Sequence, residues 1–172
     1  MSKIKVLTCA AMLTAMSVII GIFCKNFMNF GMGLFRVTFE NFPIMLTGVL
    51  FGPLIGGIVG GATDLISYLL SSQVYPPNLI VTLGAVMIGV VSGASSRFIV
   101  RKRCVKQFIV SGILAHLIGS VIIKSIGLYQ FYGILVLWRI PLYIVIASVE
   151  ILLMCVVYRN SNFRKLLEDF GR

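Results

Sequence analysis

The sequence predicts an all-α integral membrane protein with six transmembrane helices and with both termini in the cytoplasm. Hydrophobic residues make up 59% of the chain, charged residues only 12%, and mean hydropathy is +1.04. Ordinary soluble domains are roughly 45–50% hydrophobic and 25% charged. A membrane-spanning helix needs about 20 apolar residues, so 172 residues with short loops allow about six helices. No stretch remains for a soluble domain, and residues 1–172 are expected to form a single transmembrane domain.

The first three helices are expected at residues 4–24, 37–51 and 54–70. The apolar run that follows Lys3 and Lys5 is longer than the roughly 7–15 residues of a signal-peptide core, so we expect it to stay in the mature protein. Pro43 interrupts the second run, and the Gly52-Pro53 pair makes a tight turn before the third. Glycines recur at every fourth position of the third helix, which favours close packing against a neighbouring helix.

The last three helices are expected at residues 79–99, 107–128 and 134–158. Two consecutive prolines, Pro76 and Pro77, stop the third helix and stiffen the loop before the fourth. A basic hairpin at residues 97–106 joins the fourth and fifth helices, and residues 129–133 make a short turn before the sixth. The charged tail after Tyr158 predicts a short amphipathic segment on the membrane surface.

Lysine and arginine are distributed unevenly between the ends of the predicted helices. With the N-terminus placed in the cytoplasm, all but four of the 15 basic residues fall at cytoplasmic ends. The positive-inside rule therefore favours this orientation, in which the first, third and fifth loops face the exterior. The four exceptions fall at outer helix ends and are Lys25, Arg36, Lys124 and Arg139.

Several kinds of chemistry are disfavoured by missing motifs. The chain has no GxxxxGK[ST] phosphate-binding loop and no HExxH motif, and its one histidine, His116, is expected to be a packed or hydrogen-bonded residue within the fifth helix. The cysteines form no CxxC pair and are expected to be small buried hydrophobic residues: Cys9, Cys24, Cys104 and Cys155. We therefore expect no enzymatic activity or catalytic residue, no metal site, no cofactor and no nucleic-acid partner.

Two carboxylates, Glu40 and Asp64, fall where the predicted helices should contact only hydrocarbon. Ionisable groups inside a membrane are costly and by default mark a functional site. Other polar and aromatic groups fall on the same outer half of the molecule, where they could converge on one pocket open to the exterior. The candidate ligand-binding residues are Arg36, Glu40, Asp64, Tyr68, Tyr75, Asn78, Lys124, Trp138 and Arg139.

A structural role is the alternative for these outer residues. Tyrosine and tryptophan commonly form a belt at the membrane interface, and long cationic side chains extend toward it. That role is favoured for Tyr132 and Tyr143, and the two acids could simply pair with neighbouring cations. A functional role is favoured for both acids and for Arg139, because an unpaired charge inside the membrane is costly.

The chain resembles the substrate-binding S components of energy-coupling factor (ECF) vitamin transporters, and most of all the folate-specific, FolT-like subgroup. The resemblance is strongest between residues 36 and 93. It is carried by RVTFENF (36–42), Pro43-Ile44, FGP (51–53), GGIVG (56–60), Asp64, Tyr75-Pro76 and the small-residue pair Ala11 and Ala15. The chain departs from that subgroup at Glu40-Asn41, where a glycine-containing pair is usual, and at Pro76-Pro77, where an aromatic residue often intervenes.

The resemblance implies a vitamin pocket on the outer side of a six-helix protein in the bacterial plasma membrane. It also implies docking through Ala11 and Ala15 onto a membrane coupling subunit driven by two ATPase subunits. In such a pocket a flat ring would stack on Trp138, a protein carboxylate would accept hydrogen bonds from the ring, and outer cations such as Arg139 would hold a ligand carboxylate.

Other functions stay open at this point. The chain could serve another vitamin, such as riboflavin or pantothenate, because those relatives share the proline and Gly-Pro features. It could also be a stand-alone channel or secondary carrier that uses Glu40 and Asp64 as ion sites, or a structural subunit of a membrane complex. Small carriers usually contain an inverted repeat, and none is evident in this sequence.

Overall fold

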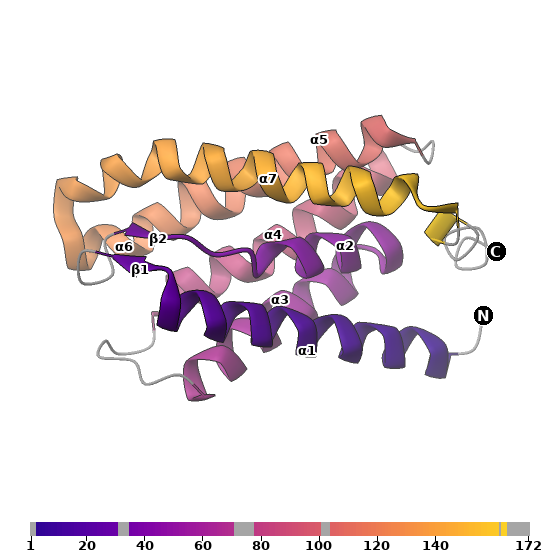
Figure 1. Cartoon of the computed structure of the whole chain (residues 1–172), viewed down its shortest axis with the longest axis horizontal. Helices are drawn as coiled ribbons and strands as arrows, with labels where there is room; N and C mark the ends of the chain where they lie inside the picture. Colours follow the sequence, from indigo (N-terminus) through magenta and orange to yellow (C-terminus); the bar gives the residue numbers. More distant parts are fainter. Residues whose placement is uncertain (1–2, 31–34, 71–77, 101–103, 162, 165–172) are drawn as a thin grey trace.

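The computed structural model describes residues 3–30, 35–70, 78–100, 104–161 and 163–164, and it is a bundle of helices. Figure 1 shows that the start of the first helix and the end of the last lie at the same end of the bundle. The elements are α1 (Lys3–Phe27), β1 (Asn29–Phe30), β2 (Phe35–Arg36), α2 (Asn41–Phe51), α3 (Pro53–Leu70), α4 (Leu79–Phe98), α5 (Val105–Ala115), the π-helix η1 (His116–Lys124), α6 (Ser125–Tyr132), the 3-10 helix η2 (Gly133–Trp138) and α7 (Arg139–Arg159).

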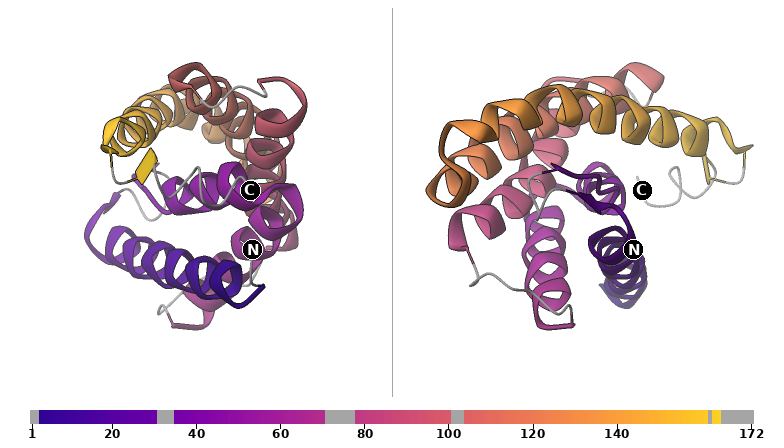
Figure 2. Two further views of the ribbon diagram at one scale, coloured as in Figure 1. Left: turned by 90° about the vertical axis from the view of Figure 1, so that its right-hand side faces the viewer. Right: turned by 60° about the vertical axis from the view of Figure 1, so that its left-hand side comes forward.

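The short helix α2 is the central element of the bundle. It is apolar on all sides, and every residue except Phe42 is buried. Ile44 and Met45 have no solvent-exposed surface. In the views of Figures 1 and 2, α2 lies between α1 and α7. A helix without a polar face is typical of a fully buried position, which is the position that α2 occupies.

The second helix begins at Asn41, and not near Val37 as the sequence predicts. Residues 37–39 are not helical, because β2 pairs with β1 in antiparallel and the Val37 amide donates to the Met28 carbonyl at 3.1 Å. Pro43 lies in the first turn of α2, where a missing amide proton costs no hydrogen bond. Pro43 therefore fits the start of the helix and does not interrupt it.

Glycines bring α2, α3 and α4 into close contact. Gly52 ends α2 with a φ of 100°, a conformation that glycine adopts without strain, and α3 begins at the next residue. A Cβ atom on Gly56 would lie 2.7 Å from the Gly48 Cα, and one on Gly89 would overlap the Gly56 carbonyl. The close packing predicted for the glycine-rich helix is confirmed, and this crossing has no room for larger side chains.

Residues from Val105 to Arg159 form one helical run of 55 residues in which the geometry changes several times. The π-helix η1 follows α5, and α6 continues to Tyr132, beyond the end predicted at residue 128. Gly133 has a φ of 56° and begins η2. Figure 1 shows the chain turning back in this region, so that α7 returns beside α5. The run therefore contains a helical hairpin.

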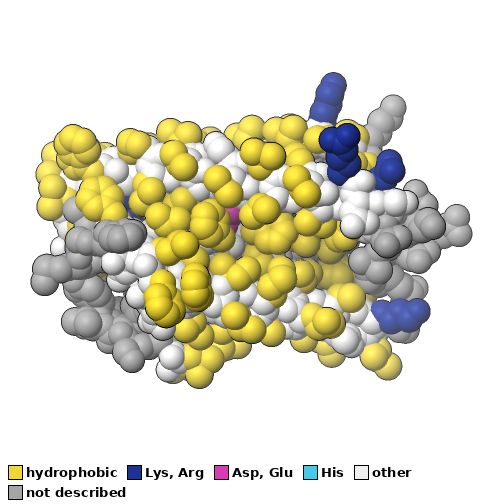
Figure 3. Space-filling view, viewed as in Figure 1, with side chains coloured by type: hydrophobic (Ala, Val, Ile, Leu, Met, Phe, Trp, Pro, Cys, Tyr) yellow, Lys and Arg dark blue, Asp and Glu magenta, His cyan; other side chains and the backbone are white. Residues whose placement is uncertain are grey.

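The bundle has the dimensions and the surface of a membrane protein. Within the described ranges, four helices are long and apolar enough to cross a membrane, and a shorter apolar helix accompanies them: Lys3–Phe27, Pro53–Leu70, Leu79–Phe98 and Val105–Arg159, with Asn41–Phe51 as the shorter one. Figure 3 shows hydrophobic side chains over the face between the two ends, and lysine and arginine side chains gathered near the chain ends. The chain is an all-helical membrane protein apart from the two short strands.

Candidate ligand-binding pocket

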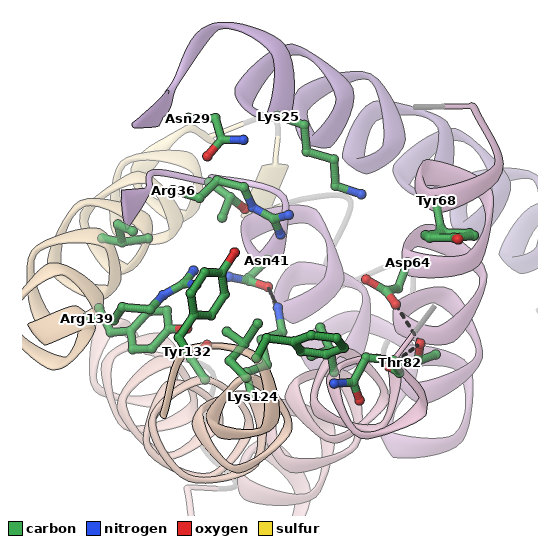
Figure 4. Close-up of a pocket in the computed structure, with 18 of the residues that line it drawn as sticks. Lys25, Asn29, Arg36, Asn41, Asp64, Tyr68, Thr82, Lys124, Tyr132 and Arg139 are labelled. Atoms are coloured by element: carbon green, nitrogen blue, oxygen red, sulfur yellow. Dashed lines mark hydrogen bonds between the residues drawn. The ribbon is translucent and has the colours of Figure 1, made fainter. Parts of the chain in front are cut away.

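A pocket opens at the end of the bundle opposite the start of α1. Its walls come from the end of α1, the β1–β2 hairpin, the start of α2, and from α3, α4, η1, α6 and α7. Counted out to its open mouth, and with the solvent there included, the pocket contains about 1170 Å³ of empty space. The lining residues labelled in Figure 4 are Lys25, Asn29, Arg36, Asn41, Asp64, Tyr68, Thr82, Lys124, Tyr132 and Arg139.

Four cations that lie far apart in the sequence meet in this pocket: Lys25, Arg36, Lys124 and Arg139. They come from α1, β2, η1 and α7 respectively, and all but Arg36 are buried. Figure 4 shows three of them around one side of the cavity and Lys25 reaching in from α1. Buried cations are costly without counter-charges, so a pocket that gathers four of them is suited to an anionic ligand.

Lys124 is held in position by its neighbours. Its Nζ donates to the Asn41 Oδ1 at 3.0 Å, which links the end of η1 to the start of α2. Its aliphatic stem passes over Gly84 of α4, where a Cβ atom would lie 2.6 Å from the Lys124 Cγ. The Lys124 ammonium group therefore faces the cavity in a fixed place.

Glu40 lies behind the cations and is not part of the pocket lining. Its Oε1 is 3.5 Å from the Arg36 Nη2 and 3.9 Å from the Lys124 Nζ, and its side chain is buried. Its other oxygen, Oε2, is buried without a hydrogen-bond partner among the described residues. The sequence predicts Glu40 as a ligand-binding residue, whereas the structure makes it a counter-ion for two residues that line the pocket.

Asp64 lines the pocket on the side away from Arg139 (Figure 4). Its Oδ2 accepts a hydrogen bond from the Thr82 Oγ1 at 2.7 Å, which joins α3 to α4. Tyr68 lies one turn further along α3 and also lines the cavity. This arrangement leaves a carboxylate with acceptor capacity for ligand N–H groups, beside an aromatic ring.

The predicted stacking residue, Trp138, does not line the pocket, and 69% of its surface is exposed. It ends a 3-10 helix, whose tighter turn directs Val136 inward and Trp138 outward. The aromatic rings that line the cavity are Tyr68, Phe131, Tyr132 and Tyr143. The assignment of Tyr132 and Tyr143 to a membrane-interface belt is therefore wrong. The Arg139 guanidinium lies 5.4 Å from the centre of the Tyr143 ring, one helical turn away.

Of the two predicted binding residues in and after the proline loop, the structure describes Asn78 but not Tyr75. Asn78 lines the pocket, but its Oδ1 accepts from the Ile80 amide at 2.9 Å and its Nδ2 donates to the Gly127 carbonyl at 2.7 Å. It caps the start of α4 and fastens that helix to α6, which makes it a support of the wall. Tyr75 lies outside the described residues.

A second buried acid, Glu150 of α7, escaped the sequence prediction. Its Oε2 lies 2.7 Å from the His116 Nε2, and its Oε1 accepts from the Phe42 amide at 3.2 Å. The Nδ1 of His116 lies 3.3 Å from the Ser120 Oγ, and both of these residues line the pocket floor. An acid within a long apolar helix was the available signal for Glu150, the same signal that identified Asp64.

Lys25 and Asn41 also line the pocket without having been predicted as binding residues. Lys25 could have been found as one of the basic residues at an outer helix end, whereas nothing in the sequence distinguished Asn41. Within the described residues, no group of three or more His, Cys, Asp or Glu side chains is arranged to hold a metal ion.

The fold and the pocket together define a helical membrane protein that encloses a polar, cation-rich cavity for a small molecule. The family model for the substrate-specific component of ECF transporters matches residues 5–162, so the chain belongs to that family. The family is a substrate-binding subunit of a transporter and is not an enzyme family. Among curated proteins, none matches this sequence significantly.

A solved structure supports the same fold. The crystal structure of FolT bound with folic acid is similar to this chain with a TM-score of 0.64 at 20% sequence identity. The similarity covers 91% of this chain and 90% of FolT. At that identity the comparison establishes a shared architecture over nearly the full length of both chains.

Proposed function

We propose that the chain captures folate, or a closely related vitamin, with high affinity in the outer pocket and delivers it to an ECF module for ATP-driven uptake. The observation that carries the proposal is the composition of the pocket, which combines four cations with a carboxylate and aromatic rings. Folate has matching parts, because its glutamate tail carries two carboxylates and its flat pterin ring carries N–H donors.

The two sides of the pocket suit the two ends of this ligand. Asp64 and Tyr68 lie on one side, where the carboxylate would accept hydrogen bonds from the pterin and the tyrosine would stack on it. Arg36 and Arg139 lie on the other side, where they would bind the tail carboxylates in bidentate fashion. Riboflavin has no carboxylate, so it would supply no counter-charge to these cations.

The proposal includes a topology with six transmembrane helices and with both termini in the cytoplasm of a bacterial cell. Counting α5–α6 and η2–α7 as separate spans and α2 as a short one gives this number. The gathering of basic side chains near the chain ends supports a cytoplasmic location for that end, which leaves the pocket facing the exterior (Figure 3).

The proposal further includes docking through α1 onto a membrane coupling subunit that works with two ATPase subunits. Ala11 and Ala15 are exposed on the half of α1 that lies away from the pocket. Small residues at this spacing let another helix backbone approach closely, which favours helix association in lipid.

A thermal-shift screen of the purified protein against vitamins tests the ligand. We expect folate to raise the melting temperature in a concentration-dependent way, because a ligand that binds only the folded state stabilises it. Pantothenate, which has a carboxylate but no flat ring, should shift it less, and riboflavin and thiamin should not shift it. A shift with one of these vitamins and none with folate would exclude folate as the substrate.

A further inference from the structure

The two pocket cations nearest to Glu40 are already partly neutralised by it. Its carboxylate contacts both Arg36 and Lys124, at 3.5 and 3.9 Å, from the side away from the cavity. Because Glu40 does not line the cavity, a ligand would meet the two cations but not the acid behind them. Glu40 therefore acts on a ligand by its charge and by neutralising these two cations, and not by direct contact.

Glu40 is fixed in this place by its backbone. Its carbonyl accepts a hydrogen bond from the Ser17 Oγ of α1, and its amide donates to the Thr38 Oγ1 at 3.4 Å. On the α1 side the carboxylate fits against Gly21, where a Cβ atom would lie 2.6 Å from the Glu40 Oε2. The carboxylate is therefore a counter-charge that is packed in a fixed place between α1 and the pocket.

The charges around the cavity can be counted. Four cations line it, one carboxylate lines it, and Glu40 lies directly behind, which leaves two net positive charges. Glu150, whose Oε2 lies 2.7 Å from the His116 Nε2, does not line the cavity and is not included in this count. Residues 31–34 and 71–77, which the structure does not describe, contain no Lys, Arg, Asp, Glu or His. The count therefore covers the charged residues of these connecting segments as well.

We propose that Glu40 is a positioning residue that determines charge specificity: through Arg36 and Lys124 it sets the pocket at two net positive charges and so selects ligands with two carboxylates. This inference rests on the proposed function and narrows it to the dicarboxylate forms of the ligand. Without Glu40 the site would favour a ligand with one further negative charge. In a partly buried site, an unmatched unit charge has a large cost.

Three compounds with the same pterin-aminobenzoate core separate charge from shape. Pteroate carries one carboxylate, folate two, and folate extended by one γ-linked glutamate three. Dissociation constants for all three would be measured with the wild type, Glu40→Gln, Glu40→Asp and Ser17→Ala, each purified as the full chain. Ser17→Ala is the matched control, because it removes the side-chain donor to the Glu40 carbonyl without changing any charge, and Ser17 does not line the cavity.

For the wild type we expect folate to bind at least about tenfold more tightly than either of the other two compounds. Glu40→Gln should shift the ratio of the folate and diglutamyl dissociation constants about tenfold in favour of the diglutamyl form. Because the ratio compares the same two ligands on both proteins, differences in ligand size cancel. Glu40→Asp should keep the wild-type ratio, and Ser17→Ala should change all three constants by a common factor.

The possible failures are distinguishable. If the wild type binds none of the three compounds, the proposed folate function is wrong, and the inference falls with it. If the wild type binds folate but Glu40→Gln changes all three constants equally, Glu40 has only a structural role and the inference alone is wrong. If Glu40→Gln does not fold, the affinities of the wild type for the three compounds decide the question. A wild type that binds pteroate or the diglutamyl form as tightly as folate, or more tightly, would contradict a pocket with two net positive charges.

Discussion

Arg139 is the residue in which burial, charge and position in the pocket coincide most clearly. It is buried at the start of α7, it lies over the Tyr143 ring, and it lines the cavity. Arg139→Ala should weaken folate binding by roughly 2–5 kcal/mol, the range for loss of a desolvated charged hydrogen bond. Isothermal titration measures the loss. Arg159→Ala, at the far end of the same helix, is the control, and equal affinity of Arg139→Ala and wild type would remove Arg139 from the site.

Glu150 is expected to contribute to stability more than to ligand contact. Glu150→Ala leaves the Phe42 amide and His116 without their partner, and removing one member of a buried pair costs about 3–5 kcal/mol. Glu150→Gln keeps an oxygen acceptor and should cost less. Unfolding of the detergent-solubilised protein would be compared with Ser148→Ala, which alters an exposed hydroxyl on the same helix. Equal stability of Glu150→Ala and Ser148→Ala would contradict this role.

At the residue scale, the sequence identifies acids and cations better than aromatic residues. Asp64, Lys124 and Arg139 were predictable because a charged residue within or beside an apolar run is costly in a membrane and by default indicates a functional site. Trp138 and Tyr143 were not, because both roles of an aromatic residue, lining a pocket and facing lipid, suit an apolar surface. The choice between them depends on the 3-10 turn before α7, which leaves no clear pattern in the sequence.

Among the elements, the contact between α3 and α4 depends most directly on small residues. Gly89→Ala would push a methyl group into the Gly56 carbonyl, and overpacking of this kind costs typically about 1–3 kcal/mol. Gly61→Ala is the matched control, because its added methyl would meet only the Val86 Cγ2, at 3.2 Å. Melting temperatures of the two variants should therefore separate clearly. Similar values for both would show that the α3–α4 backbones are not in close contact.

The exposed face of α1 predicts a separation of ligand binding from uptake. Replacing Ala11 and Ala15 together by Trp should block docking on the coupling subunit, while binding of ligand to the isolated chain persists. Uptake in cells that carry the complete complex would be compared with binding to the purified chain. The control is Leu152→Trp with Val156→Trp, an exposed pair of the same spacing on α7. Loss of ligand binding, or unchanged uptake, would contradict docking through this face.

At the element scale, the apolar runs and the Gly-Pro pair predicted most helices. The predicted and observed bounds differ mainly where one helix connects to the next. The start of α2 was misplaced because residues 37–40 directly adjoin the helix and include the hydrophobic Val37 and Phe39, while residues 37–39 are not helical. The hydrogen bond between Val37 and Met28 lies between segments that the sequence pattern does not pair. The π-helix η1 was missed because its apolar sequence carries no signal that distinguishes it from the α-helices on either side.

At the scale of the whole molecule, the basic residues lie at the two ends of the bundle, and each end has its own part in the proposed function. Basic side chains gather near the chain ends, and the buried cations gather at the opposite end around a cavity (Figures 3 and 4). A hydrophobic surface covers the part between them (Figure 3). The proposed function uses all three regions: the pocket for capture, the apolar surface for the bilayer, and α1 for the partner.

The most direct test of the account is native mass spectrometry of the purified protein after incubation with an equimolar mixture of folate, pantothenate, riboflavin and thiamin. The account predicts a single dominant adduct with the mass of one folate per chain. The same adduct should weaken strongly in Arg139→Ala and persist in Arg159→Ala. A dominant adduct with riboflavin or thiamin, or no adduct with any of the four, would contradict a pocket built for a ring ligand with two carboxylates.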